Sequence, residues 1–291
     1  MPITSRATGI AIAGAAAAAI APSPALARNA VFGGSTSKGA PIVITADKKA
    51  KTLRSAVVSW RAVCDDGRGF PIGVPLEPVA ADPGFSPGFR ELATSRNSKG
   101  RFAGTQVGGL DMGDHVAALV AKYTGKLSAK RAGGTIDATI TMIEKASRNV
   151  VATCRTGTVR WSATRSPGRV FGGSTAQDLP VVVRLDAKRR AVADLLYNWE
   201  SATCKPDDVY LNANEDFSSF PLQSGRFGDA FDQTYTPDGG GEGKASYDIT
   251  GRVARTRASG SVRVNVTETD PAGAVTMACD SGTVPWEAVS G

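Results

Sequence analysis

A long internal repeat constrains this chain of 291 residues more than any other feature. The stretch VFGGSTSKGAPIVI begins at Val31 and returns as VFGGSTAQDLPVVV at Val170. Further segments recur in the same order: Trp60 with Cys64 as Trp199 with Cys204, GRF at 100–102 as 225–227, TGKLSAKRAGGTIDATI from 124 as TGRVARTRASGSVRVNV from 250, and CRTGTVRWSA from 154 as CDSGTVPWEA from 279. Solenoid and propeller repeats are much shorter. The repeat therefore predicts two whole domains, 28–166 and 167–291, with residues 165–169 as their linker.

The apolar pattern inside each half has period two, which is typical of strands with one buried and one solvated face. Residues 135–142 read TIDATITM and residues 261–267 read SVRVNVT. We therefore expect an all-β protein of two tandem homologous antiparallel domains, each a β-barrel or β-sandwich of about eight strands. Pro285 lies in the last predicted strand and cannot donate to a ladder. We expect that strand to have a free side, which favours a sandwich or an incompletely closed barrel.

Each half contains two cysteines, at matching positions. Of the three possible pairings, only Cys64–Cys154 with Cys204–Cys279 lets each domain fold alone. Each bond would close a loop long enough to be worth roughly 4 to 5 kcal/mol in the chain-entropy model, less any strain. No two cysteines form a CxxC pair, so the sequence predicts disulfides rather than a zinc or redox site, and it leaves no thiol nucleophile.

Residues 1–27 are typical of a secretory signal peptide. Arg6 supplies a positive charge, residues 9–20 are apolar, and Ala25-Leu26-Ala27 offers the small residues that a signal peptidase needs. The apolar stretch is too short to span a bilayer, and no later segment is long and apolar enough. We therefore expect cleavage after Ala27, no transmembrane segment in the mature chain, and a secreted or extracytoplasmic protein, in agreement with the disulfides.

The repeat resembles the modules of an uncharacterised group of secreted actinobacterial proteins. The likeness is carried by the early FGGxT followed by proline, the GRF segment, the late T-G-[KR] hairpin and the closing C-x-x-G-T-V-x-W. It covers nearly the whole mature chain, although its motifs are short. The resemblance implies export and a disulfide-containing β module, and it transfers no functional residue.

The glycine pairs Gly33-Gly34 and Gly172-Gly173 are interpreted as structural. Each pair follows a strand-like Val-Phe, where a bulge or a tight turn would suit the fold. A phosphate-binding loop is disfavoured because there is no GxxxxGK[ST] motif and no following helix.

Candidates for chemistry are few. His115 is the single histidine, so a Ser-His-Asp arrangement with Asp111 or Asp114 is open only to the first domain, and a solvated loop residue is the simpler interpretation. Oxygen-rich loops could hold calcium, but they lack EF-hand spacing and their aspartates are common turn formers. These loops contain Asp65, Asp66, Asp207, Asp208, Asn212, Asn214, Glu215 and Asp216. We expect no metal and no cofactor, and we single out no catalytic residue.

Charge separates the two halves. Residues 28–166 contain 21 Lys and Arg against 10 Asp and Glu, a net charge of +11, and residues 167–291 contain 12 against 17, a net charge of −5. The basic domain could adhere to anionic envelope polymers, or the split could reflect attraction between the domains or drift of solvated faces. Export and the lack of a recognised motif argue against nucleic acid as a partner.

The sequence thus predicts an exported two-domain β protein that acts without catalysis, as a binding module or a cell-envelope-associated module. The alternative is a secreted hydrolase that uses carboxylates, whose separation in space the sequence does not reveal.

Overall fold

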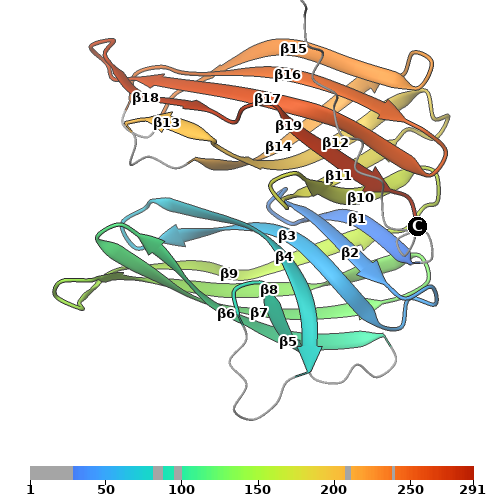
Figure 1. Cartoon of the computed structure of the whole chain (residues 1–291), viewed down its shortest axis with the longest axis horizontal. Coiled ribbons are helices and arrows are strands. Elements are labelled where there is room, and N and C mark those ends of the chain that lie inside the picture. The colour runs from blue at the N-terminus through green and yellow to red at the C-terminus, as the bar shows by residue number, and fades with distance from the viewer. Residues whose placement is uncertain (1–28, 81–87, 95–99, 207–210, 238–239) are drawn as a thin grey trace, which may run out of the picture.

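Every regular element of the described chain is a β-strand, so the all-β prediction is confirmed. The computed structural model describes residues 29–80, 88–94, 100–206, 211–237 and 240–291; the predicted signal peptide lies outside them. Each half of the chain forms its own sheet, and the two sheets lie one above the other in Figure 1. Within the described residues there is no helix with the length and apolar character needed to cross a membrane.

The first half of the chain is a closed barrel of nine strands. All neighbouring strands are antiparallel except β4 and β5, which are parallel, and the last strand closes the ring by pairing with the first. The strands are β1 (Ala30–Thr36), β2 (Pro41–Ala46), β3 (Leu53–Cys64), β4 (Gly69–Ala80), β5 (Glu91–Thr94), β6 (Arg101–Met112), β7 (His115–Leu127), β8 (Arg131–Glu144) and β9 (Val150–Thr164).

The second half has ten strands with the same order of pairing and one break. Two of its strands correspond to the end of β3 and the start of β9, and none of the described strands corresponds to β5. The strands are β10 (Val170–Thr175), β11 (Pro180–Leu185), β12 (Ala191–Glu200), β13 (Thr203–Lys205), β14 (Asn212–Pro221), β15 (Arg226–Tyr235), β16 (Gly243–Val253), β17 (Arg257–Thr269), β18 (Val275–Asp280) and β19 (Val284–Val289). Because β14 and β15 do not pair, the second barrel is incompletely closed.

The break does not lie where Pro285 suggested. Strand β19 pairs with β10 on one side and with β17 on the other, so the expectation of a free side on this strand was wrong. The carbonyl of Pro285 accepts a hydrogen bond from the amide of Ala176, in the turn that follows β10. Since N–H and C=O of one strand residue point the same way, the missing proline N–H faces that turn, and β17 loses no ladder bond.

Both predicted disulfides are present, Cys64–Cys154 and Cys204–Cys279, and each lies inside one domain. The first joins the end of β3 to β9, and the second joins β13 to β18. Two disulfides in one chain indicate an oxidising, extracytoplasmic compartment.

Each sheet encloses its own apolar core, as the alternating pattern requires. Trp60 and Trp161 are buried in the first core, and Trp199 and Trp286 are buried in the second. A third, smaller cluster joins the domains: Val31 and Val43 pack against Val182 and Leu196. Strand β1 is consequently buried on both faces, with Phe32 in its own barrel and Val31 against the other domain.

The first glycine of each FGGST copy lies in this interface. A Cβ on Gly33 would be 2.7 Å from Val182 Cγ1, and a Cβ on Gly172 would be 2.8 Å from Val43 Cγ1. Gly33 and Val43 of one copy correspond to Gly172 and Val182 of the other, so the contact is reciprocal, like the two-fold interface of a homodimer. The glycines let the two sheets approach closely.

The second glycine of each copy serves its own domain. A Cβ on Gly34 would lie 1.9 Å from the Ser162 carbonyl oxygen, and one on Gly173 would lie 1.9 Å from the Glu287 carbonyl oxygen. Both glycines lie within regular strands, in continuous register with the neighbouring strand. The expected bulge or tight turn was therefore wrong, and the reason for glycine is the close approach of the closing strand.

We predict that Gly33→Ala lowers the free energy of unfolding by about 1 to 3 kcal/mol, because the new methyl group overpacks Val182. Denaturant unfolding of Gly33→Ala, Val182→Ala and the double variant measures the effect, and the double variant should lose less than the sum of the two. Gly109→Ala is the control, because its Cβ would be 3.8 Å from the nearest atom. Additive losses would contradict the proposed contact.

Candidate functional site

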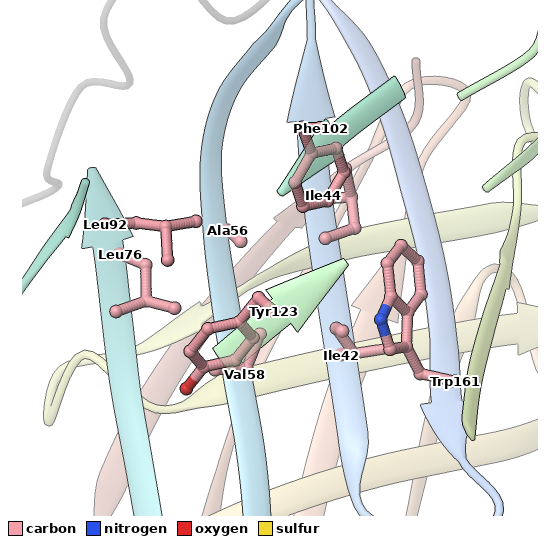
Figure 2. A pocket seen from close by; sticks show the side chains of 9 residues that line it. All are labelled: Ile42, Ile44, Ala56, Val58, Leu76, Leu92, Phe102, Tyr123 and Trp161. Carbon is pink, nitrogen blue, oxygen red and sulfur yellow. The ribbon is translucent and has the colours of Figure 1, made fainter. Parts of the chain in front are cut away.

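Apolar side chains fill the described part of the first barrel's interior, and the void among them is too small for an organic ligand. The void described there has a volume of about 10 Å³, roughly what one water molecule needs. Figure 2 shows the apolar side chains that converge on it from seven strands. They are Ile42, Ile44, Ala56, Val58, Leu76, Leu92, Phe102, Tyr123 and Trp161. This void offers no binding site to an organic molecule, which favours the outer surface of this domain as the place of a binding site.

The polar groups inside the first barrel satisfy one another. Trp60 Nε1 donates to the Tyr123 hydroxyl at 3.0 Å, this hydroxyl donates to Gln106 Oε1 at 2.7 Å, and Gln106 Nε2 donates to the Phe89 carbonyl at 2.6 Å. Burial raises the pKa of Tyr123 well above its ordinary value, so the phenol keeps its proton. The chain of hydrogen bonds ties four strand and loop segments together and holds no reactive group.

In the second domain, four apolar positions of the same inner face have become polar. Superposing the repeat through strand register aligns the pairs Val74 and Glu215, Leu110 and Tyr235, Ala121 and Tyr247, Met142 and Glu268. All four polar residues alternate with core residues of their strands, so they face inward. Sequence reasoning had identified Glu215 but not its three companions; comparing the two copies position by position is the signal that finds them.

These four side chains form two hydrogen-bonded pairs. Glu215 Oε1 accepts from Trp199 Nε1 at 3.2 Å, and the carboxylate also accepts from the Tyr247 hydroxyl. Burial raises the pKa of Glu215 above its ordinary value, although both hydrogen bonds oppose the rise. Tyr235, with 41% of its surface exposed, donates to Glu268 Oε1 at 2.7 Å. The inner face of the open barrel thus holds two carboxylates next to aromatic rings.

The other oxygen-bearing residues of this strand point elsewhere. Asn198 Nδ2 donates to Asn212 Oδ1 at 2.9 Å and to Asn214 Oδ1 at 3.0 Å, so these oxygens are engaged. Asp216 is exposed, on the face opposite to Glu215. Among the described residues there is no group of three or more His, Cys, Asp or Glu side chains that could hold a metal ion.

The acidic loop after Cys64 is a turn. Asp66 pairs with Arg68 at 2.6 Å, and the pKa of Asp66 is lowered, first by its hydrogen bond from Arg68. Asp65 Oδ1 accepts from the Thr153 amide at 3.2 Å. The equivalent pair, Asp207 and Asp208, lies outside the described residues.

His115 begins β7 beside a turn, opposite Glu144 of β8. Asp111 forms an ion pair with Lys145 Nζ at 2.7 Å, and the Asp114 carbonyl accepts from the Lys145 amide. The Asp111 carboxylate is thus engaged by Lys145, and within the described residues no hydrogen bond joins His115 to either aspartate, which favours the solvated loop interpretation.

The outer surface of β6–β9 carries a concentration of positive charge that we call the basic face. Strand register places Arg101 beside Lys126, and it places Lys122, Arg160 and Arg155 within the adjoining rows of outward residues. All five are exposed, and none forms an ion pair with a described residue. Strands β6, β7 and β8 lie on the side of the first domain that is away from the second (Figure 1).

The second domain keeps cations at two of these positions, with Arg226 and Arg252 in place of Arg101 and Lys126, but it differs in the other rows. Asp248 stands where the first domain has Lys122, Asp280 where it has Arg155, and Arg263 where it has Asp137, the one acidic residue of those rows. Arg263 pairs with Asp280 at 2.6 Å, which neutralises both. Total charge was visible in the sequence, whereas the gathering of five unpaired cations on one face required the strand register.

The domain interface makes little use of the charge difference. Its centre is the apolar cluster, and the ion pair that the described residues form across it, Arg90 with Asp178 at 2.9 Å, is exposed on both sides. An exposed pair of this kind contributes little to stability. The basic face therefore remains available to a partner outside the chain.

Comparison with known proteins adds no relative: no family model, no curated protein and no solved structure matches the chain. Any functional conclusion rests on the residues described above.

We predict that Glu215 makes the stability of the protein fall as pH rises above the ordinary carboxyl pKa of about 4.3. A raised pKa means that the folded state binds more protons than the unfolded state, so stability is lost between that value and the raised pKa. Glu215→Gln should lack this loss in denaturant unfolding measured from pH 3 to pH 8. Glu287→Gln, at an exposed carboxylate of β19, controls for the loss of one charge. Identical pH profiles for wild type and Glu215→Gln would contradict the assignment.

Proposed function

We propose that the protein is an exported, non-enzymatic binding protein whose first domain attaches to anionic polymers of the cell envelope. The observation that carries the proposal is the basic face: five exposed cations on β6, β7 and β9 of a closed barrel, none of them ion-paired with a described residue. Positive side chains held on one rigid sheet raise the local potential, and a flexible polyanion can contact several of them together.

Three further features support this proposal. The void described inside the first barrel is too small for an organic ligand, which favours its surface for binding. The disulfides suit an oxidising compartment, where envelope polymers are found. Strands β6–β8 lie on the side of the barrel away from the second domain, so a long polymer can run along them without meeting it (Figure 1). The hydrolase alternative stays a prediction, and its carboxylates would be Glu215 and Glu268.

Binding of this kind should depend strongly on salt, because each contact releases a counterion. For flexible polyanions the slope is about 0.7 per contact, so five contacts would weaken binding about 100-fold between 0.05 and 0.2 M salt. Long-chain polyphosphate and polygalacturonate are suitable probes, because one presents phosphates and the other carboxylates.

We predict that Lys122→Ser with Arg155→Ser weakens polyanion binding at least tenfold at 0.1 M salt, since two of five contacts are lost. Isothermal calorimetry or a pull-down on immobilised polymer measures the change. Arg252→Ser with Arg257→Ser is the matched control, because it removes two exposed arginines from the second domain. Equal weakening by both double variants would show that only net charge matters, and no binding by wild type at low salt would refute the proposal.

A further inference from the structure

The two copies of the repeat differ most at one seam. In the first domain, β5 lies between β4 and β6, pairing parallel with β4 and antiparallel with β6, and so completes the ring. In the second domain, β14 and β15 occupy the places of β4 and β6, and only Leu222–Gly225 connect them. Among the described strands, β14 pairs with β12 alone and β15 with β16 alone. Each therefore presents an unpaired edge toward the other.

The first domain shows what fills such a seam. Leu92 of β5 is 1% exposed and packs over Gly104 of β6, where a Cβ would be 2.7 Å from Leu92 Cγ. Phe89, just before β5, covers Gly108 in the same way and accepts a hydrogen bond from Gln106 through its carbonyl. One short extended segment thus contributes apolar side chains to the core and main-chain groups to both neighbouring strands.

Aromatic side chains line the inner side of the seam between β14 and β15, and we call this group, Phe217, Phe231 and Tyr247, the floor. The ring of Phe217 on β14 meets the ring of Phe231 on β15 edge-on, with centroids 6.0 Å apart. Tyr247 stacks on Phe231 from the next strand, at 5.1 Å. Phe217 is buried, whereas Phe231 is only half-buried. The side chains of β14 and β15 are thus in contact, whereas the main chains of the two strands form no ladder with each other.

Two carboxylates lie on the same face as this floor. Strand β14 contributes Glu215 and β15 contributes Asp229, which share the inward alternation of Phe217 and Phe231, whereas Asp216 and Asp232 lie on the opposite face. Asp232 is paired with Lys244 at 2.7 Å, while Glu215 faces inward beside the floor. At the place of Asp229 the first domain has Gly104, the residue over which Leu92 packs. An occupant of this seam would therefore meet carboxylates where β5 meets apolar surface.

We propose that an extended, positively charged peptide segment of a partner protein pairs with β14 and β15 and closes the second barrel as β5 closes the first. Unpaired strand edges are templates for an added strand, and main-chain hydrogen bonds supply affinity while side-chain contacts supply specificity. A lysine or arginine of the segment pairs with Glu215 or Asp229, and an apolar neighbour packs on Phe217 and Phe231.

The charge pattern distinguishes this occupant from a second copy of the chain. Two copies joined edge to edge along β14 or β15 would bring aspartate and glutamate residues of the same strand face to face, and like charges opposite each other in a sheet are destabilising. A basic segment meets the same edges with opposite charge. This seam is separate from the basic face of the first domain, so either proposal can fail without the other.

The test uses the internal template as a probe. A blocked peptide with the sequence of residues 88–94 and the change Glu91→Lys, acetyl-GFRKLAT-amide, is titrated into the isotope-labelled purified protein. We expect saturable amide shift changes confined to residues 212–221 and 226–235, and slower hydrogen exchange of those amides in the complex. The acidic peptide acetyl-GFEELAT-amide should bind at least tenfold more weakly.

Variants of the protein complete the test. Glu215→Gln with Asp229→Asn should weaken binding of the basic peptide about tenfold or more, as expected for charge-assisted hydrogen bonds. Asp229→Asn alone, at an exposed position, should act in the same direction if the double variant does not fold. Asp248→Asn with Glu287→Gln removes two exposed charges from the outer face of the same domain and should leave binding unchanged. Shift changes elsewhere in the protein, equal binding of both peptides, or equal loss in both double variants would overturn the proposal.

Discussion

The reciprocal contact between glycine and valine across the domain interface determines how the two halves of this protein are joined. Gly33 receives Val182, and Gly172 receives Val43. Each contact depends on the absence of a side chain. The glycines of the FGGST copies are therefore explained by close packing of the two sheets rather than by a turn or a binding loop. Because the same strands also close their barrels against Ser162 and Glu287, interface and barrel are built from one short segment.

On this common scaffold, the two domains differ at a small number of positions with large physical consequences. Two outward cations of the first sheet, Lys122 and Arg155, correspond to aspartates in the second, and four inward residues of the second are acidic or phenolic where the first has apolar ones. The first barrel is closed and its described interior is filled, whereas the described strands of the second include no counterpart of β5. The two domains therefore differ in surface charge and in barrel closure, and each offers a partner a different surface.

Period-two patterning and the matched cysteines were enough to predict the all-β class and the two disulfides, because both are local or symmetric properties. The position of the barrel opening could not be predicted, since Pro285 is accommodated by a turn contact with Ala176 that only the folded chain brings together. The basic face and the companions of Glu215 were hidden for a similar reason: they come from several strands, and strand register alone decides which side chains share a face. The alternating pattern showed which segments form strands, but it did not show which strands lie next to each other in the sheet.

The symmetry of the interface also suggests how the two-domain chain evolved. In this interface a glycine of each copy packs against a valine of the other copy. A single module can make the same pair of contacts with a second molecule of itself. Such a module would have been a homodimer, and fusing two genes through the short segment Arg165–Arg169 would have fixed the pair at equal stoichiometry. Once each half had its own coding segment within the fused gene, one half was able to change without altering the other. The presence of a ninth barrel strand, β5, in only one of them illustrates this.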